Sequence, residues 1–292
     1  MQKKIIVKEL LRRQDSMASR PEKNRSRVQM LPSHHQIPRT LLSQMTVELV
    51  VQELSKRGSS KAREGMSRFG IRTSKALGVS IPQIRDLARK IGTDHELAQQ
   101  LWITGIHEAR ILASMVDDPA KVSEDQMEKW ALEFDSWDVV DGCCGNLFDK
   151  TGFAIRKAHE WSKRKEEFVK RAGFVLMAEL AVHDKKASNQ TFLDFLPATV
   201  REASDERNFV KKAVNWAVRQ IGKRNSVLNS AAIKTCAEIR NSGSGSAKWI
   251  AADALRELTS SSVRKKLAKI KIYGRIKSSS AGSNCHSIRI LS

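Results

Sequence analysis

The chain has 292 residues, of which 40% are hydrophobic, enough to bury a sizeable core. Lysine and arginine outnumber aspartate and glutamate by 52 to 32, so the formal charge is +20 and a polyanion is the expected partner, with nucleic acid favoured over an anionic membrane. No apolar run approaches the roughly 18 residues of a membrane span, and the four cysteines match neither a disulfide framework nor a zinc site.

The two ends of the chain are basic extensions for which we expect disorder. Residues 1–48 hold 10 basic and 4 acidic residues, and residues 259–292 hold 8 basic residues and no acidic one. Low hydrophobicity with many serines predicts disorder over residues 1–45 and 271–292. For the first 16 residues, a basic amphipathic targeting helix and an over-extended start before Met45 are both open interpretations.

Between these extensions, residues 46–270 are predicted to form an all-α domain. Apolar residues recur at helical spacing, and no alternating apolar run is long enough for a strand. Ser123, with Gln126 three residues later, and Ser136 are expected N-cap residues. The expected helices cover residues 46–57, 61–69, 81–91, 95–103, 107–116, 123–134, 137–149, 152–163, 166–182, 190–202, 206–223, 227–241, 246–259 and 262–269.

Internal similarity indicates stacked helix pairs. The segment 168–172, Phe-Val-Lys-Arg-Ala, recurs 41 residues later as Phe-Val-Lys-Lys-Ala, and residues 211–221 loosely match residues 248–258. A period of about 40 residues is typical of HEAT-type repeats, which form solenoids with a concave binding surface. The alternative is chance similarity between amphipathic helices.

The helix expected to begin at Trp137 carries the first candidate site residue. Trp137, Val140, Cys144 and Leu147 form an apolar stripe, and Asp141 lies at its edge, one turn after Trp137. Asp141 is beyond the first turn, where capping and the helix dipole would explain a carboxylate. It is either a functional group beside the indole or a buried or salt-bridged structural residue.

Two further helices carry candidate residues. Arg171 projects from an apolar face and therefore needs an anion, which is Asp141, another carboxylate or a ligand phosphate. Trp216 projects among Lys212, Arg219 and Lys223, as expected of an aromatic residue that contacts nucleic acid, although packing on the next repeat is the alternative.

A rival arrangement places Trp249 one turn before Asp253, with Arg256 following. We rank it second, because the repeat array ends there.

Metal and cofactor sites are not expected. His107-Glu108 lacks the second histidine of a zinc-protease motif, no phosphate-binding glycine loop is present, and the histidines do not form pairs at i and i+4. His107 and His183 are therefore interpreted as ordinary polar residues.

Taken together, three segments resemble the HEAT-repeat DNA alkylation repair proteins, the AlkD-like alkylpurine DNA glycosylases. They are residues 136–141 (Ser-Trp-Asp-Val-Val-Asp), 170–172 (Lys-Arg-Ala) and 211–219 (Lys-Lys-Ala-Val-Asn-Trp-Ala-Val-Arg), within a likeness that covers about 47–258. The resemblance implies a C-shaped helical solenoid with DNA in its concave cleft.

The resemblance also implies roles for the candidate residues. Asp141 would be the catalytic carboxylate, Trp137 and Trp216 would contact the lesion nucleotide, and Arg171 would contact a phosphate or the active site. The expected DNA-binding residues are Lys170, Lys211, Lys212, Arg219, Lys223 and Arg224.

The expected activity is release of N3- or N7-alkylated purines from double-stranded DNA by a monofunctional, cofactor-free glycosylase. We expect a monomer inside the cell, in the cytoplasm or nucleoid, or in the nucleus or an organelle of a eukaryote. The main alternative is a catalytically silent repeat protein that binds damaged or branched DNA, and a HEAT scaffold for acidic proteins is a third.

Overall fold

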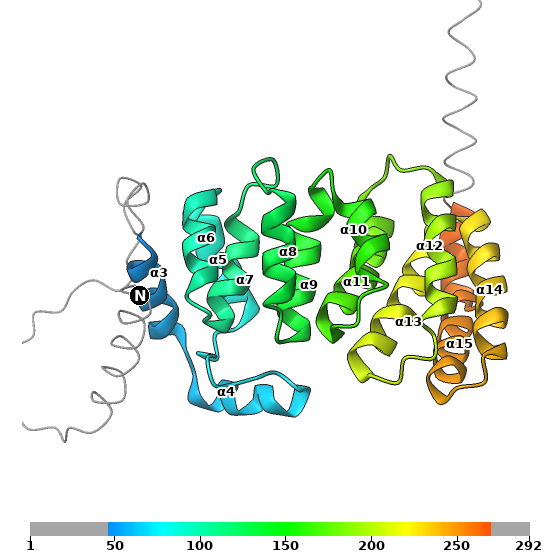
Figure 1. The fold of residues 1–292 in the computed structure, drawn as a ribbon, viewed down its shortest axis with the longest axis horizontal. Coiled ribbons are helices and arrows are strands. Elements are labelled where there is room, and N and C mark those ends of the chain that lie inside the picture. Colours follow the sequence, from blue (N-terminus) through cyan, green and yellow to red (C-terminus); the bar gives the residue numbers. More distant parts are fainter. Residues whose placement is uncertain (1–45, 270–292) are drawn as a thin grey trace, which may run out of the picture.

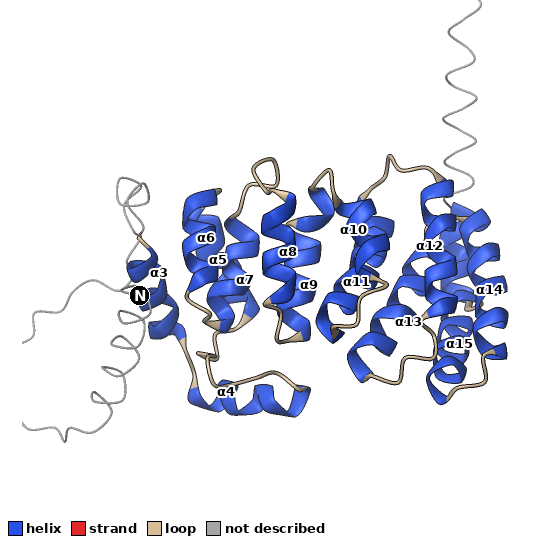
Figure 2. Cartoon of the chain, viewed as in Figure 1, coloured by secondary structure: helices blue, strands red, loops and turns tan. Residues whose placement is uncertain are grey.

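The computed structural model describes residues 46–269, and the predicted disordered extensions lie outside this range (Figure 1). The described residues form helices and loops without strands, as predicted (Figure 2). The elements are α3 (Val47–Arg57), α4 (Ser60–Met66), η1 (Ser67–Phe69), α5 (Ile81–Ile91), α6 (His95–Ile103), α7 (His107–Val116), α8 (Glu124–Leu132), α9 (Trp137–Asn146), η2 (Phe148–Lys150), α10 (Ala154–Trp161), α11 (Glu167–His183), α12 (Asn189–Arg201), α13 (Asn208–Gly222), α14 (Ser226–Asn241) and α15 (Gly245–Leu258), and residues 261–269 are also helical.

Most of these helices stand side by side in one row and stack as a solenoid (Figure 1). Helix α11 lies inside this row, packed against α9, α10 and α13. Its residues 172–178 are all buried, so α11 is an inner element of the array. Gly173 permits the close approach to α10, because a Cβ atom there would lie 2.4 Å from the backbone nitrogen of Ser162.

The predicted helix boundaries are mostly correct, and those of α5, α6 and α7 agree to the residue. The predicted helix 61–69 instead divides into α4 and η1, which ends at Gly70 in the left-handed conformation with φ 74°. The predicted helix 137–149 ends at Asn146, because Leu147 leaves the helical region with φ −131° and ψ −62°.

The two expected caps differ in the structure. The Ser123 hydroxyl accepts from the Gln126 amide at 3.1 Å, but the Gln126 side chain donates to Asp117 and does not close a capping box. Ser136 occupies the N-cap position of α9 without a capping hydrogen bond, since its hydroxyl donates to Asp138.

One short segment runs across the others. Helix α4 lies crosswise below the row and brings η1 beneath α9 (Figure 1). Glu108, which is buried in α7, holds the returning loop by accepting hydrogen bonds from the amides of Leu77, Gly78 and Val79 at 2.8, 2.6 and 3.2 Å. A buried carboxylate is costly unless it is hydrogen-bonded, so this contact fixes the loop firmly.

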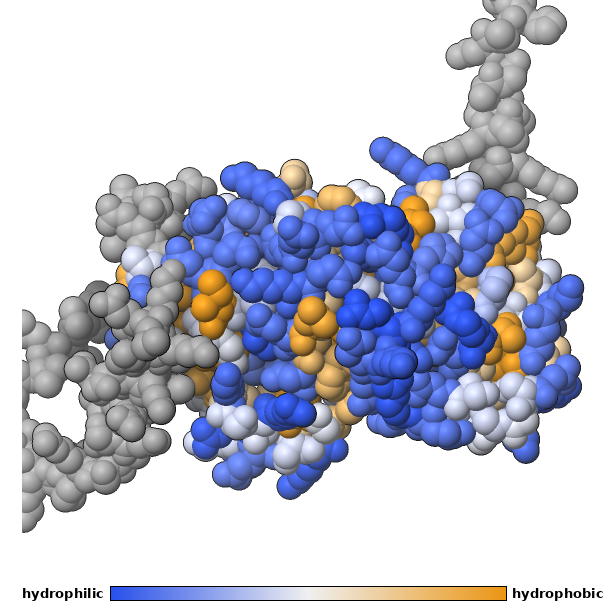
Figure 3. Space-filling model, viewed as in Figure 1, coloured by the Kyte–Doolittle hydropathy of each residue, from blue (hydrophilic) through white to orange (hydrophobic). Residues whose placement is uncertain are grey.

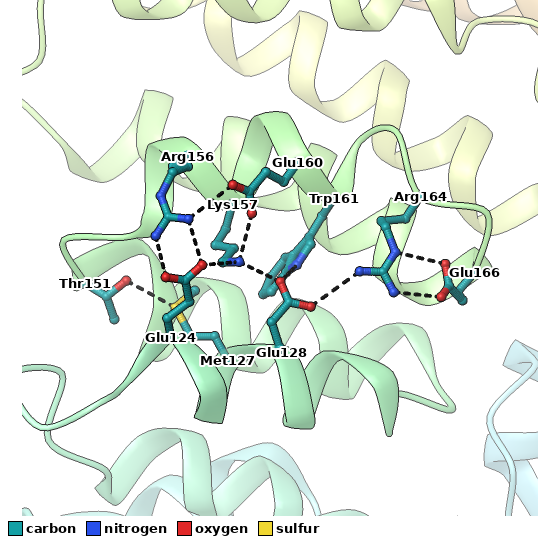
Figure 4. Close-up of polar contacts among 10 residues, drawn as sticks. All are labelled: Glu124, Met127, Glu128, Thr151, Arg156, Lys157, Glu160, Trp161, Arg164 and Glu166. Atoms are coloured by element: carbon teal, nitrogen blue, oxygen red, sulfur yellow. Dashed lines mark hydrogen bonds and ion pairs between the residues drawn. The ribbon is translucent and has the colours of Figure 1, made fainter.

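A cluster of ion pairs joins α8 to α10 (Figure 4). Lys157 is only 3% exposed, and its ammonium lies 2.7, 2.6 and 2.8 Å from carboxylate oxygens of Glu124, Glu128 and Glu160. Glu128 also accepts from the indole of Trp161 at 2.8 Å. The cluster stabilises the stacking of neighbouring repeats, because its members come from two helices.

Replacing Lys157 by Met is expected to lower the free energy of unfolding by about 2 kcal/mol at pH 7, because three carboxylates lose a common partner. Urea unfolding measures this loss, and Lys163→Met, an exposed residue nearby without an ion pair among residues 46–269, is the control.

The loss should depend on pH. Hydrogen bonds from Arg156 and Lys157 lower the pKa of Glu124 to about 2, and Lys157 also lowers the pKa of Glu160 below its ordinary 4.5. Carboxyl groups with lowered pKa stabilise the fold above pH 4.5 and cease to do so as the pH falls through their folded values. The difference between the wild type and Lys157→Met should therefore shrink between pH 4.5 and 2; an unchanged difference would contradict this account.

Candidate functional site

The centre of the candidate site is an ion pair between α9 and α11. The Arg171 Nε donates to Asp141 Oδ1 at 2.9 Å, and Nη2 donates to Oδ2 at 2.7 Å. The remaining Nη1 donates to the backbone carbonyl of Phe209 in α13 at 2.8 Å. Arg171 therefore finds its required anion in Asp141, the first of the three alternatives, and its guanidinium joins three stacked helices.

The two partners differ in accessibility. The Arg171 side chain is 7% exposed, whereas 21% of the Asp141 side chain remains exposed. Burial raises the pKa of Asp141 above its ordinary value, Arg171 opposes this shift, and the charge of Asp138 adds to it. The carboxylate is thus held in a fixed orientation by arginine, and the Asp141 side chain remains partly exposed.

Trp137 lies beside this ion pair, as the helical spacing predicted. The guanidinium carbon of Arg171 lies 5.9 Å from the centre of the indole ring, within range of a cation–π interaction. The indole nitrogen donates to the backbone carbonyl of Phe69 at 3.0 Å. These contacts place a partly exposed aromatic ring next to the carboxylate.

Trp216 occupies a different environment. It is half-buried on α13 and packs against the hydrophobic core. The described residues show no hydrogen bond or ring contact between Trp216 and Asp141, Arg171 or Trp137. Its part in the site remains a prediction.

Four of the six predicted DNA-binding residues have partners within the protein. Lys170 pairs with Glu202 and Asp205, and Arg224 donates to two backbone carbonyls while its guanidinium lies over the ring of Phe192.

The other two of these four, Arg219 and Lys223, both pair with Glu257 of α15. The positive charge that the sequence places on this face of α13 is therefore partly neutralised by a carboxylate of α15.

The remaining two predicted DNA-binding residues have no ion-pair partner among residues 46–269. Lys211 lies over the ring of Trp249, 5.5 Å from its centre, and Lys212 is exposed. Polar side chains cover most of the face seen in Figure 3, with isolated apolar residues between them.

The rival arrangement on α15 has a different geometry. Trp249 is 41% exposed, but Asp253 accepts from the side-chain amide of Asn215 at 2.7 Å and pairs with Arg256. Its contact with Arg219 is a single one, at 3.5 Å. Asp253 therefore lacks the bidentate arginine contact that orients Asp141.

Phe69 and Phe209 are the site neighbours that the sequence analysis did not identify. Both contribute a backbone carbonyl, which no side-chain pattern reveals. The sequence did contain one signal for Phe69, an aromatic residue followed by glycine within a basic stretch.

Three of the four histidines among residues 46–269, namely His95, His107 and His183, pair with carboxylates. His107 Nε2 lies 2.8 Å from Asp138, and His183 Nδ1 lies 2.5 Å from Asp149. Among residues 46–269, no group of three or more histidine, cysteine, aspartate and glutamate side chains is arranged to hold a metal ion. No helix of the same range is both long and apolar enough to cross a membrane.

Comparison with solved structures returned two similar chains. One is described as "A new family of proteins related to the HEAT-like repeat DNA glycosylases with affinity for branched DNA structures"; it is 22% identical, with a TM-score of 0.61 over 66% of this chain and 83% of that one. The other is a designed armadillo repeat protein in complex with the peptide (KR)4, 12% identical with a TM-score of 0.30 over 77% of this chain and 90% of that one. No curated protein matches the sequence.

The sequence also matches a family profile, that of the DNA alkylation repair enzymes, over residues 50–258. This match spans most of the described helices, from α3 to the end of α15, and includes the Asp141–Arg171 ion pair. The chain therefore belongs to the DNA alkylation repair enzyme family.

Proposed function

We propose that the protein is a monofunctional DNA glycosylase that releases N3- and N7-alkylated purines from double-stranded DNA. The observation that carries this proposal is the partly exposed side chain of Asp141, whose carboxylate is held by Arg171 beside the indole of Trp137. Membership of the DNA alkylation repair enzyme family supports it.

The chemistry requires one carboxylate. An N3- or N7-alkylated purine is already a cation, so it departs without a general acid, and the second carboxyl group usual in glycoside hydrolysis is unnecessary. As the glycosidic bond breaks, the deoxyribose gains positive charge, which Asp141 stabilises while it orients the attacking water. Each oxygen of Asp141 accepts one hydrogen bond from Arg171. A carboxylate can accept about four hydrogen bonds, so Asp141 keeps acceptor positions for the attacking water.

The indole of Trp137 adds a second favourable interaction. The face of an indole ring attracts a nearby cation by about 0.5 to 2 kcal/mol, and in this reaction the positive charge of the alkylated base passes to the sugar as the glycosidic bond breaks. A neutral lesion gains little from these groups, so the site should select charged adducts.

The second candidate function is binding of damaged or branched DNA without base release. Two observations favour it: Arg171 already binds both oxygens of Asp141, and a protein of similar fold is described as related to the glycosylases with affinity for branched DNA. Both functions predict salt-sensitive DNA binding, so only release of free base separates them.

The substitution Asp141→Asn tests the proposed chemistry. It should reduce release of methylated purine by about a hundredfold or more and leave DNA binding unchanged, because the amide cannot balance the positive sugar. Chromatography of bases released from methylated DNA measures the rate. Asp253→Asn is the matched control, since Asp253 also follows a tryptophan by one turn. Equal rates for Asp141→Asn and the wild type would refute the role of Asp141.

Two substitutions of Arg171 separate its charge from its geometry. Arg171→Gln removes the cation that opposes the raised pKa of Asp141, so the acid limb of the pH–rate profile should move to higher pH. Arg171→Lys keeps the charge but loses the bidentate contact, so the rate should fall about tenfold with a smaller shift of that limb. Circular dichroism checks that both variants fold, and an acid limb that stays in place in Arg171→Gln would show that Asp141 does not control the rate.

The role of Trp216 is tested by comparing Trp216→Ala with Trp137→Ala. If Trp216 contacts the lesion nucleotide, its loss should reduce base release more than binding to undamaged duplex, measured by fluorescence anisotropy. An equal loss of affinity for damaged and undamaged duplex would instead assign Trp216 to contact with the DNA backbone.

A further inference from the structure

The segment of residues 60–75, here called the basic segment, carries five basic residues and one acidic residue. It includes helix α4, η1 and the start of the loop that follows. None of its lysines and arginines forms an ion pair within residues 46–269, in contrast to the paired cations of α13. Its basic residues are all exposed: Lys61, Arg63, Arg68, Arg72 and Lys75.

Phe69 lies in the middle of these charges and is 68% exposed. Exposure of a phenylalanine ring is unfavourable in water, and this ring is the most exposed of the large hydrophobic side chains among residues 46–269. An aromatic ring between cations is instead typical of surfaces that stack on nucleic-acid bases while the charges contact phosphates.

The backbone at Phe69 is fixed against the candidate site by two contacts. Its carbonyl accepts from the indole nitrogen of Trp137 at 3.0 Å. The next residue, Gly70, approaches α13 so closely that a Cβ atom would lie 2.8 Å from the ring of Phe209. Since Trp137 and Phe209 both also contact Arg171, the exposed ring projects from a backbone that borders the Asp141–Arg171 pair.

We propose that Phe69 is a base-stacking residue, which enters the DNA stack next to the nucleotide held at Trp137 and Asp141. Arg68, Arg72 and Lys75 contact the flanking phosphates. The inference rests on the proposed DNA function, but it does not require base release, because stacking and hydrolysis involve different residues.

The energetics of nucleotide displacement favour such a role. Displacing a nucleotide from the stack costs a few kcal/mol, and a side chain that fills the gap recovers part of this cost. The position of Phe69 on a firmly held segment means that little side-chain freedom is lost on binding, since phenylalanine has only two rotatable side-chain bonds.

The test uses the full chain and a duplex with a stable abasic-site analogue opposite 2-aminopurine, a base that brightens when it unstacks. Wild-type protein should brighten the probe on binding. Phe69→Ala should abolish the brightening and weaken binding to this duplex about tenfold, with little effect on undamaged duplex. Phe69→Trp should restore both properties, because it retains an aromatic face. Leu132→Ala, which removes another exposed apolar side chain, is the control and should behave as wild type; Leu132 is 59% exposed.

Two results would overturn the inference: full brightening by Phe69→Ala, or an equal loss of affinity for damaged and undamaged duplex. The outcome is independent of the glycosylase assay. Base release without a Phe69-dependent signal would support the proposed function and refute the role of Phe69. A Phe69-dependent signal without base release would support the role of Phe69 and refute the proposed glycosylase activity.

Discussion

The arrangement of the site depends on the cost of burying an arginine. A guanidinium within an apolar helix is unfavourable unless its charge and its hydrogen-bond donors are satisfied. In this protein Asp141 and the carbonyl of Phe209 satisfy them, which draws α9 and α13 to α11. The same contacts orient the carboxylate, so one interaction both stabilises the stacking of the repeats and prepares the group proposed to act on DNA.

Helical periodicity was sufficient to predict the helices and the proximity of Trp137 to Asp141, because both depend on residues within one or two turns. It also showed that Arg171 needs an anion. What it missed depends on contacts between distant segments: Glu257 pairs with the α13 cations, and the Phe69 carbonyl meets Trp137 across 68 residues. Backbone carbonyls have no sequence signature, so such contacts become visible only in the folded chain.

Net charge alone describes the surface poorly. Many cations of the solenoid form ion pairs with carboxylates of the protein itself. In the cluster around Lys157, for example, three glutamates surround one ammonium. These cations cannot attract phosphate without breaking pairs. The basic segment differs because its charges have no such partners in the described part of the chain, so it offers a free positive potential next to the site.

The contacts of Arg171 also have a consequence for how this architecture can change during evolution. Repeat proteins commonly gain or lose units, since each unit touches only its neighbours. Here α9, α11 and α13 share one guanidinium, so inserting or deleting a unit between them would disconnect Asp141 from Arg171 or Arg171 from Phe209. Units outside the stretch from α9 to α13 are free of this restriction, and variation in repeat number should therefore accumulate toward the ends of the array.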